Sequence, residues 1–285
     1  MTKQTPLQAR IAAAAAQTDM NEASKGGGTR VLPEQGMVRL RLISYIELGI
    51  HDDEYKGVIK KPNKVVLQFE LSGPKHPPTT LEDGRVIPQV ITVNEKISLN
   101  EKANFYKLFK RMNHTGTFTH MAEMLGTEFL GTVVHVTKGE GADAKSYANL
   151  RDDGGYTIRP PFVEDAETGE SKRITVAPAL TPIKCFLWDY ACKEDWDSIF
   201  IDGVWDDRKD ATGKVTEVGR SKNFYQLQIK AANNFAGSAI ADLLFAGLEE
   251  PDLDDAETPD RSDDDIQAGV ERKSKAAADP LEGVA

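Results

Sequence analysis

Apolar and polar residues alternate along three stretches in the first half of the chain. The first runs from Met37 to about Leu48, the second covers 65–71, and the third extends from about Val90 to Ile97. Alternation with a period of two is typical of strands that bury one face, because successive side chains of a strand point to opposite sides. The pattern therefore predicts three consecutive strands.

The spacing then changes to the helical period. Ser98 and Glu101 have the separation of a capping box, which predicts a helix start at this point. A second, short helix is expected over 119–125, followed by strands over 129–137 and 146–150. The apolar residues that support the first helix recur at intervals of three or four and are Leu99, Ala103, Tyr106, Phe109 and Met112.

Three strands, a helix and two strands follow one another in the order of the OB-fold, a five-stranded Greek-key barrel. We therefore expect a mainly β fold: an OB-like β-barrel with a helix between strands 3 and 4, plus a mixed α/β extension. The predicted parts are a flexible N-terminal arm (1–36), the OB-like barrel (37–150), an extension packed on the barrel (151–248) and a disordered acidic tail (249–285).

Within the extension the pattern is less regular. Short strands are expected over 174–176 and 183–188, and helices over 224–233 and 238–248. The segment Phe200–Trp205 contains an Asp-Gly pair between apolar residues, which predicts a small hairpin.

Charge is distributed unevenly along the chain. The net charge is −10, but residues 249–285 alone hold 13 acidic and 4 basic residues, a net of −9. Residues 37–113 hold 13 basic and 9 acidic residues, a net of +4, whereas residues 114–248 carry a net of −6. The acidic character therefore belongs mostly to the tail and does not exclude a polyanionic partner for the body.

Motifs of known chemistry are absent from the sequence. Cys185 and Cys192 lack the paired spacing of a zinc site, and there is no phosphate-binding glycine loop. We expect no catalytic site, no metal and no cofactor, and a cytoplasmic protein, since no apolar run has the length of a membrane span. One enzymatic alternative stays open: a metal-dependent nuclease whose acidic site would be assembled from Asp52, Asp152 or Asp206.

Basic and aromatic residues favour nucleic-acid binding. On the first strand, alternation places Arg39, Arg41 and Tyr45 on one face, opposite Leu40 and Leu42. Guanidinium groups neutralise phosphates, and aromatic rings stack on bases. Further candidates lie in the loops after strands 1 and 4, which frame the groove of an OB-fold, and on the helix. The full predicted set for single-stranded DNA is Arg39, Arg41, Tyr45, Tyr55, Lys56, Lys60, Lys61, Lys64, Lys107, Lys110, Arg111, Lys138, Lys145 and Tyr147.

The acidic tail is a candidate for a second kind of contact. A tethered polyanion competes with DNA for a basic groove, or recruits a partner protein once DNA has displaced it. The residues expected to do this are Asp252, Asp254, Asp255, Asp263, Asp264 and Asp265.

With these residues in view, the sequence resembles the single-stranded DNA-binding proteins encoded by bacteriophages. The resemblance covers about half of the chain and rests on the segments VRLRLISYIELG (38–49), KVVLQFEL (64–71), SLNEKA (98–103), GTVVH (131–135) and YANL (147–150). It implies an OB-type core that binds single strands without sequence specificity in phage DNA replication, recombination or repair. It also implies an acidic C-terminal tail that engages replication or recombination proteins, in the cytoplasm of a host cell.

A non-enzymatic alternative stays open as well. The chain could be a protein-interaction or virion-associated structural protein without affinity for nucleic acid, with the alanine-rich arm and the acidic tail as its contact devices. The sequence predicts no membrane association, and it leaves self-association into a homo-oligomer open.

Overall fold

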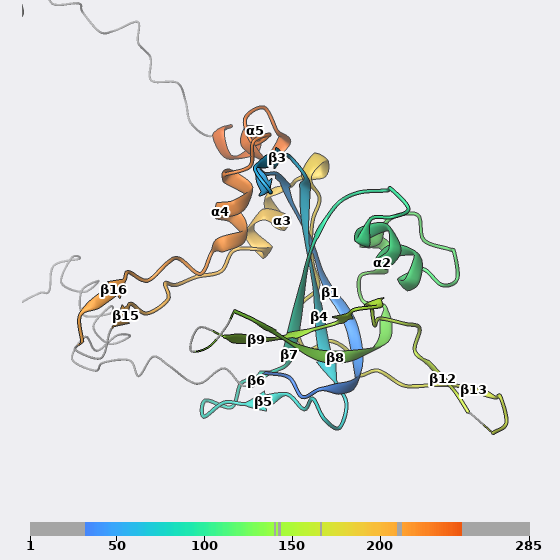
Figure 1. The fold of residues 1–285 in the computed structure, drawn as a ribbon. Helices are drawn as coiled ribbons and strands as arrows, with labels where there is room; N and C mark the ends of the chain where they lie inside the picture. Colours follow the sequence, from blue (N-terminus) through green and yellow to red (C-terminus); the bar gives the residue numbers. More distant parts are fainter. Residues whose placement is uncertain (1–31, 140, 142–143, 166, 210–212, 247–285) are drawn as a thin grey trace, which may run out of the picture. The chain divides into compact units, whose positions relative to one another are not determined.

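A computed structural model of the chain describes residues 32–139, 141, 144–165, 167–209 and 213–246 (Figure 1). The predictions for most of the arm (1–31) and for the acidic tail fall outside these residues. The chain divides into two units, 1–243 and 244–285, and the elements described here belong to the first except for the end of the last helix. Among the described residues, none of the helices is both long and apolar enough to span a membrane.

The fold is mainly β, as predicted, and is built on one six-stranded sheet. Five strands pair antiparallel in the order β7-β4-β1-β8-β9, and a short sixth strand, β14, runs parallel to β1. Within the described chain no ladder joins the end strands β7 and β9, so the sheet is not closed into a barrel. The strands are β1 (Gly36–Ile50), β4 (Asn63–Ser72), β7 (Gln89–Lys96), β8 (Glu128–Lys138), β9 (Lys145–Asn149) and β14 (Lys184–Phe186).

A β-bulge divides β1 into two halves. The register against β4 shifts between Leu42 and Ser44, so that one extra residue, Ile43, is inserted. Leu42 and Tyr45 consequently face the same core, and the prediction that Tyr45 shares an outer face with the arginines is wrong. The first half of β1 pairs with β8, whereas the second half pairs with β14.

The helix between β7 and β8 is α2 (Asn104–Met112), which begins six residues after the predicted cap at Ser98. Its N-cap is Ala103, without a side-chain hydrogen bond, so the predicted capping box is wrong. The side chain of Asn100 accepts a hydrogen bond from the backbone N–H of Lys102 at 2.9 Å and holds this segment as a turn. The predicted short helix is the 3₁₀-helix η1 (Met121–Met124), whose own capping box is formed by His120 and Glu123.

The hydrophobic core lies between the inner face of the sheet and α2. Glu95 of β7 links the edge of the sheet to residues 151–156, because Tyr156 donates a hydrogen bond to its carboxylate at 2.5 Å and Arg151 lies 4.0 Å from it. The largest buried core side chains come from three strands and two helices and include Leu40, Leu42, Tyr45, Leu67, Phe69, Leu71, Leu108, Met112, Met124 and Phe129.

Small hairpins and short helices complete the fold. The hairpin strands are β2 (Asp53–Tyr55), β3 (Val58–Lys60), β5 (Thr79–Thr80), β6 (Val86–Ile87), β10 (Arg151–Asp152), β11 (Gly155–Tyr156), β12 (Phe162–Glu164), β13 (Ser171–Arg173), β15 (Arg208–Lys209) and β16 (Val215–Glu217). The remaining helices are η3 (Trp188–Tyr190), α3 (Lys193–Ser198), α4 (Phe224–Lys230) and α5 (Ala239–Phe245).

Two local predictions for the extension are wrong. Residues 174–176 are not a strand, because they run across the sheet as part of an irregular segment. The predicted hairpin over 200–205 does not form either, since Val204 bridges to Ser221 and the backbone N–H of Trp205 donates to Arg220. The Asp-Gly pair does turn the chain, but the residues that follow it pair with a segment further along the sequence.

The extension is fixed to the second half of β1. Gly49 has a φ of +83° and lies so close to the ring of Trp188 that no side chain fits between them. At the strand end, Ile50 receives a hydrogen bond from the backbone N–H of Asn233 at 2.7 Å and donates one to Asn234 at 2.8 Å. Residues distant in sequence therefore form one packed unit with the sheet.

Candidate nucleic-acid interface

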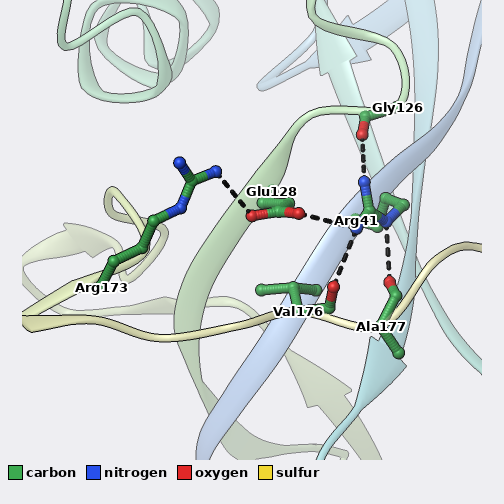
Figure 2. A network of polar contacts seen from close by, with 6 residues as sticks. All are labelled: Arg41, Gly126, Glu128, Arg173, Val176 and Ala177. Carbon is green, nitrogen blue, oxygen red and sulfur yellow. Dashed lines mark hydrogen bonds and ion pairs between the residues drawn. The ribbon is translucent and has the colours of Figure 1, made fainter.

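Arg41 is the most completely bonded of the predicted binding residues, and its side chain is mostly buried. It lies beneath the irregular segment 174–183, which we call the strap (Figure 2). Two of its four acceptors are backbone carbonyls of this strap. The nitrogen–oxygen distances are 2.8 Å to Ala177, 3.0 Å to Val176, 2.5 Å to the carbonyl of Gly126 and 3.0 Å to the carboxylate of Glu128.

Glu70 holds the next part of the same strap. Its buried carboxylate accepts hydrogen bonds from the backbone N–H groups of Leu180 at 2.8 Å and Thr181 at 2.9 Å. The strap therefore covers the outer face of β1 and β4 where Arg41 and Glu70 lie. Arg41 serves this attachment, and the prediction that it neutralises phosphate is not supported by its surroundings.

Glu128 joins a second arginine to the network (Figure 2). Its carboxylate accepts a hydrogen bond from Arg173 at 3.0 Å as well as the one from Arg41. Burial opposes ionisation of Glu128, but the hydrogen bonds from the two arginines outweigh it and lower the pKa of the carboxyl group.

The other two predicted contacts on β1 also differ from expectation. Tyr45 is buried in the core and its hydroxyl donates to Glu47 at 3.0 Å, so its ring offers no surface to a base. Burial raises the pKa of this hydroxyl. Arg39 is half-buried, with its aliphatic part beside Gly73, next to a cavity of about 270 Å³.

Basic side chains gather instead where β4 and β7 meet the β2–β3 hairpin. Lys64 and Lys96 lie directly opposite each other across the two strands. Asp53 of the hairpin forms an ion pair with Lys96, and this hydrogen bond, with the nearby charges of Lys64 and Lys60, lowers its pKa. A cavity of about 360 Å³ opens here and is lined by Leu48, Asp53, Lys64, Val65, Asn94, Glu95, Lys96 and Gln228.

The hairpin itself presents an aromatic ring and further lysines. Tyr55 is 61% exposed, and the ammonium group of Lys56 lies 5.3 Å from the centre of its ring. Lys56 and Gly57 both have positive φ, 52° and 75°, as a two-residue type I′ turn requires. Lys60 and Lys61 follow and are exposed. The turn fixes the aromatic and basic side chains at the exposed end of the hairpin.

A second pair of facing lysines ends the β8–β9 ribbon. Lys138 and Lys145 are directly paired, and Tyr147 pairs with Val136 two residues further on, hence on the same face. Tyr147 is 47% exposed. No ion pair of either lysine is present in the described part of the chain.

The helix residues are not part of these groups. Lys107, Lys110 and Arg111 are exposed on α2, whose opposite face packs in the core. Figure 1 shows α2 well separated from the β2–β3 hairpin. Charged residues are expected on the solvent-facing side of an amphipathic helix, and this position explains the three basic residues of α2.

The outer face of β7 is a further exposed polar surface, which was not among the predicted sites. Thr92, Asn94 and Lys96 are exposed at alternate positions, while Ile91 and Val93 are buried. The alternation that predicted this strand already contained the signal, because Lys96 lies in phase with the polar side.

The residues of the enzymatic alternative do not converge. Asp52 accepts a hydrogen bond from Asn233 at 2.7 Å, and Asp152 accepts one from the backbone of Gly154 within its own turn. In the ranges that the structure describes, no group of three His, Cys, Asp or Glu residues is arranged to hold a metal ion. Comparisons with protein-family models, curated proteins and solved structures gave no match for the chain.

Proposed function

We propose that the protein binds single-stranded DNA without sequence specificity. One observation carries this proposal: two pairs of lysines face each other directly across strands, and an exposed tyrosine lies near each pair. The pairs are Lys64 with Lys96 and Lys138 with Lys145. Tyr55 belongs to the hairpin next to the first pair, and Tyr147 lies on the face of the second.

Facing lysines destabilise an antiparallel sheet because their charges repel. A phosphate placed between Lys138 and Lys145 relieves this repulsion, so the cost in the free protein becomes a gain in the complex. At the first pair the charge of Lys96 is already shared with Asp53, and Lys64 is the cation left to bind phosphate. Exposed tyrosine rings add stacking, which contributes about 1–3 kcal/mol per base and accepts any base. Phosphate neutralisation combined with stacking supports binding of a single strand in preference to a duplex, whose bases are already stacked.

The strand order supports an OB-like arrangement of the sheet. In chain order the five long strands are β1, β4, β7, β8 and β9, with α2 between the third and the fourth. OB-folds bind oligonucleotides on the face of strands 2 and 3 and with the loops after strands 1 and 4. By this correspondence the ligand would cross the outer face of β7, between the two lysine pairs.

The proposed biological role follows from the sequence resemblance. The protein would protect single strands during phage DNA replication, recombination or repair, in the host cytoplasm. The acidic tail would compete with DNA for the lysine-rich surface or bind replication and recombination proteins.

The direct test is a titration of a labelled oligo-dT with the full chain, followed by fluorescence anisotropy at two salt concentrations. We expect salt-sensitive binding, since each phosphate contact contributes roughly −0.7 to the log–log slope for a single strand. A duplex of the same length, used as the control, should bind more weakly. Absence of any anisotropy change at low salt would refute the proposal.

A second candidate is protein binding without nucleic-acid affinity. It is favoured by exposed apolar side chains on the extension, among them Phe224 and Leu227 of α4. Failure of the anisotropy test together with specific capture of a protein by the full chain, lost in Leu227→Asp, would support this candidate instead.

A further inference from the structure

The extension carries an arm that lies apart from the lysine pairs. This arm, which is distinct from the N-terminal arm, comprises residues 204–209 and 213–222. Figure 1 shows its strands β15 and β16 standing away from the six-stranded sheet. Its two chains are joined by the bridge between Val204 and Ser221 and by a backbone hydrogen bond of 2.8 Å from Trp205 to Arg220. The arm therefore has a defined backbone at its base.

Trp205 differs from the other two tryptophans. It is 61% exposed, whereas Trp188 is 7% and Trp196 is 5% exposed. Gly219 allows this arrangement, because its backbone lies directly against the carbonyl group of Trp205 and leaves no room for a side chain. A large aromatic ring held in solvent on a defined backbone is unusual, since tryptophan side chains normally gain by burial.

One cationic group lies over this ring, and two more line the cavity beside it. The ammonium group of Lys222 lies 5.1 Å from the ring centre. Arg208 and Arg220 are exposed and both bind the carboxylate of Glu217, at 3.0 and 2.8 Å, so that two guanidinium groups share one acid. A cavity of about 180 Å³ is lined by Trp205, Asp206, Arg208, Glu217, Val218, Gly219 and Arg220.

Three acidic residues lie close to these cationic groups. Asp207 is engaged by the backbone N–H of Gly219 at 2.7 Å. Asp206 and Glu217 line the cavity together with Arg208 and Arg220, whereas Lys222 has no ion pair within the described part of the chain. An exposed aromatic face next to guanidinium and ammonium groups matches a nucleobase with its phosphates better than it matches an apolar peptide.

We propose that Trp205 is a second base-stacking site, with Lys222 and Arg220 contacting the adjacent phosphates of the same single strand. This inference rests on the proposed function and extends it to the arm. It also predicts which tryptophan responds to DNA. Because Trp188 and Trp196 are buried, quenching of the intrinsic fluorescence by oligo-dT would report on Trp205.

The test compares Trp205→Ala, Trp205→Phe and the wild-type chain, with anisotropy of labelled oligo-dT and intrinsic fluorescence as two readouts. Tyr190→Ala is the matched control, since Tyr190 is another exposed aromatic residue of the extension and no cation of the described residues lies over its ring. We expect Trp205→Ala to weaken binding about tenfold, roughly 1.4 kcal/mol, and Tyr190→Ala to leave it unchanged. Trp205→Phe should keep most of the affinity and lose the fluorescence response.

The outcomes separate the two proposals. If the wild-type chain binds oligo-dT and Trp205→Ala binds with the same affinity, the arm site is refuted while the proposed function stands. If the wild-type chain does not bind, both are refuted. Equal thermal stability of wild-type and Trp205→Ala chains would show that a loss of affinity is not a loss of folding.

Discussion

Arg41 and Glu70 lie directly opposite each other across β1 and β4, and both bind the strap. The arginine donates to the carbonyl groups of Val176 and Ala177, and the glutamate accepts from the N–H groups of Leu180 and Thr181. One cross-strand pair thus satisfies both kinds of backbone group in a segment that has no regular secondary structure. The strap therefore covers the outer face of the sheet at the Arg41–Glu70 pair.

Removal of Arg41 should destabilise the protein. In Arg41→Ala the two strap carbonyls, Gly126 and Glu128 lose their donor, and we expect the free energy of unfolding to fall by about 3–5 kcal/mol, as is typical when one partner of a buried charge pair is removed. Urea denaturation measures this change. Arg39→Ala is the control on the same face of β1, with an expected change below about 0.5 kcal/mol. Equal effects of the two substitutions would contradict the role assigned to Arg41.

Arg41 and Glu70 should be coupled through the strap. Once Arg41→Ala has loosened the strap, Glu70→Ala should cost less than it does in the wild-type chain. A double-mutant cycle should therefore give a coupling of about 1 kcal/mol, with the double variant less destabilised than the sum of the single variants. Strict additivity would show that the two residues hold the strap independently.

Acid should weaken the Glu128 network. The pKa of Glu128 lies below its ordinary value of 4.5 in the folded protein, so its contribution to stability is present above that value and is lost as the pH falls through the folded pKa. The difference in stability between the wild-type chain and Glu128→Gln should therefore be largest at neutral pH and shrink below about pH 4.5. Chemical denaturation of both chains along a pH series measures it, and a constant difference would contradict this assignment.

The Lys138–Lys145 pair should lower the stability of the free protein and strengthen its binding to DNA. Lys145→Glu replaces repulsion by attraction across the strands, and we expect about 0.5 kcal/mol of added stability. The same change should weaken oligo-dT binding and reduce its salt dependence by about 0.7 in the log–log slope. Ser146→Glu places the same charge on the opposite face of the ribbon and should affect binding less. Improved stability without any loss of binding would exclude this pair from the interface.

The long strands of the sheet were predictable because they bury one face over many residues. The alternation around Leu67 and Val93 is set by local burial, and the structure places both residues in the core. The bulge at Ile43 was not predictable from alternation, since Leu42 and Ile43 are both apolar and the sequence does not show which of them is the extra residue. It changes the side on which Tyr45 lies, and this single residue explains the error in the candidate site.

The partners of the strap were also beyond the reach of sequence patterns. Arg41 and Glu70 are separated from their strap partners by more than a hundred residues, and nothing local distinguishes a guanidinium that binds phosphate from one that binds carbonyl groups. The basic hairpin, in contrast, was predictable from composition, because Lys56, Lys60 and Lys61 are exposed wherever the loop lies.

The most direct test of the account compares two triple variants that remove the same number of positive charges from different faces. Lys64→Gln/Lys138→Gln/Lys145→Gln removes three charges from the proposed interface, and Lys107→Gln/Lys110→Gln/Arg111→Gln removes three from α2. Anisotropy of labelled oligo-dT across a salt series should show salt-sensitive binding by the wild-type chain, reduced by about 2 in the log–log slope for the first variant. The second variant should bind like the wild-type chain. No binding by the wild-type chain, or equal losses in the two variants, would contradict the account.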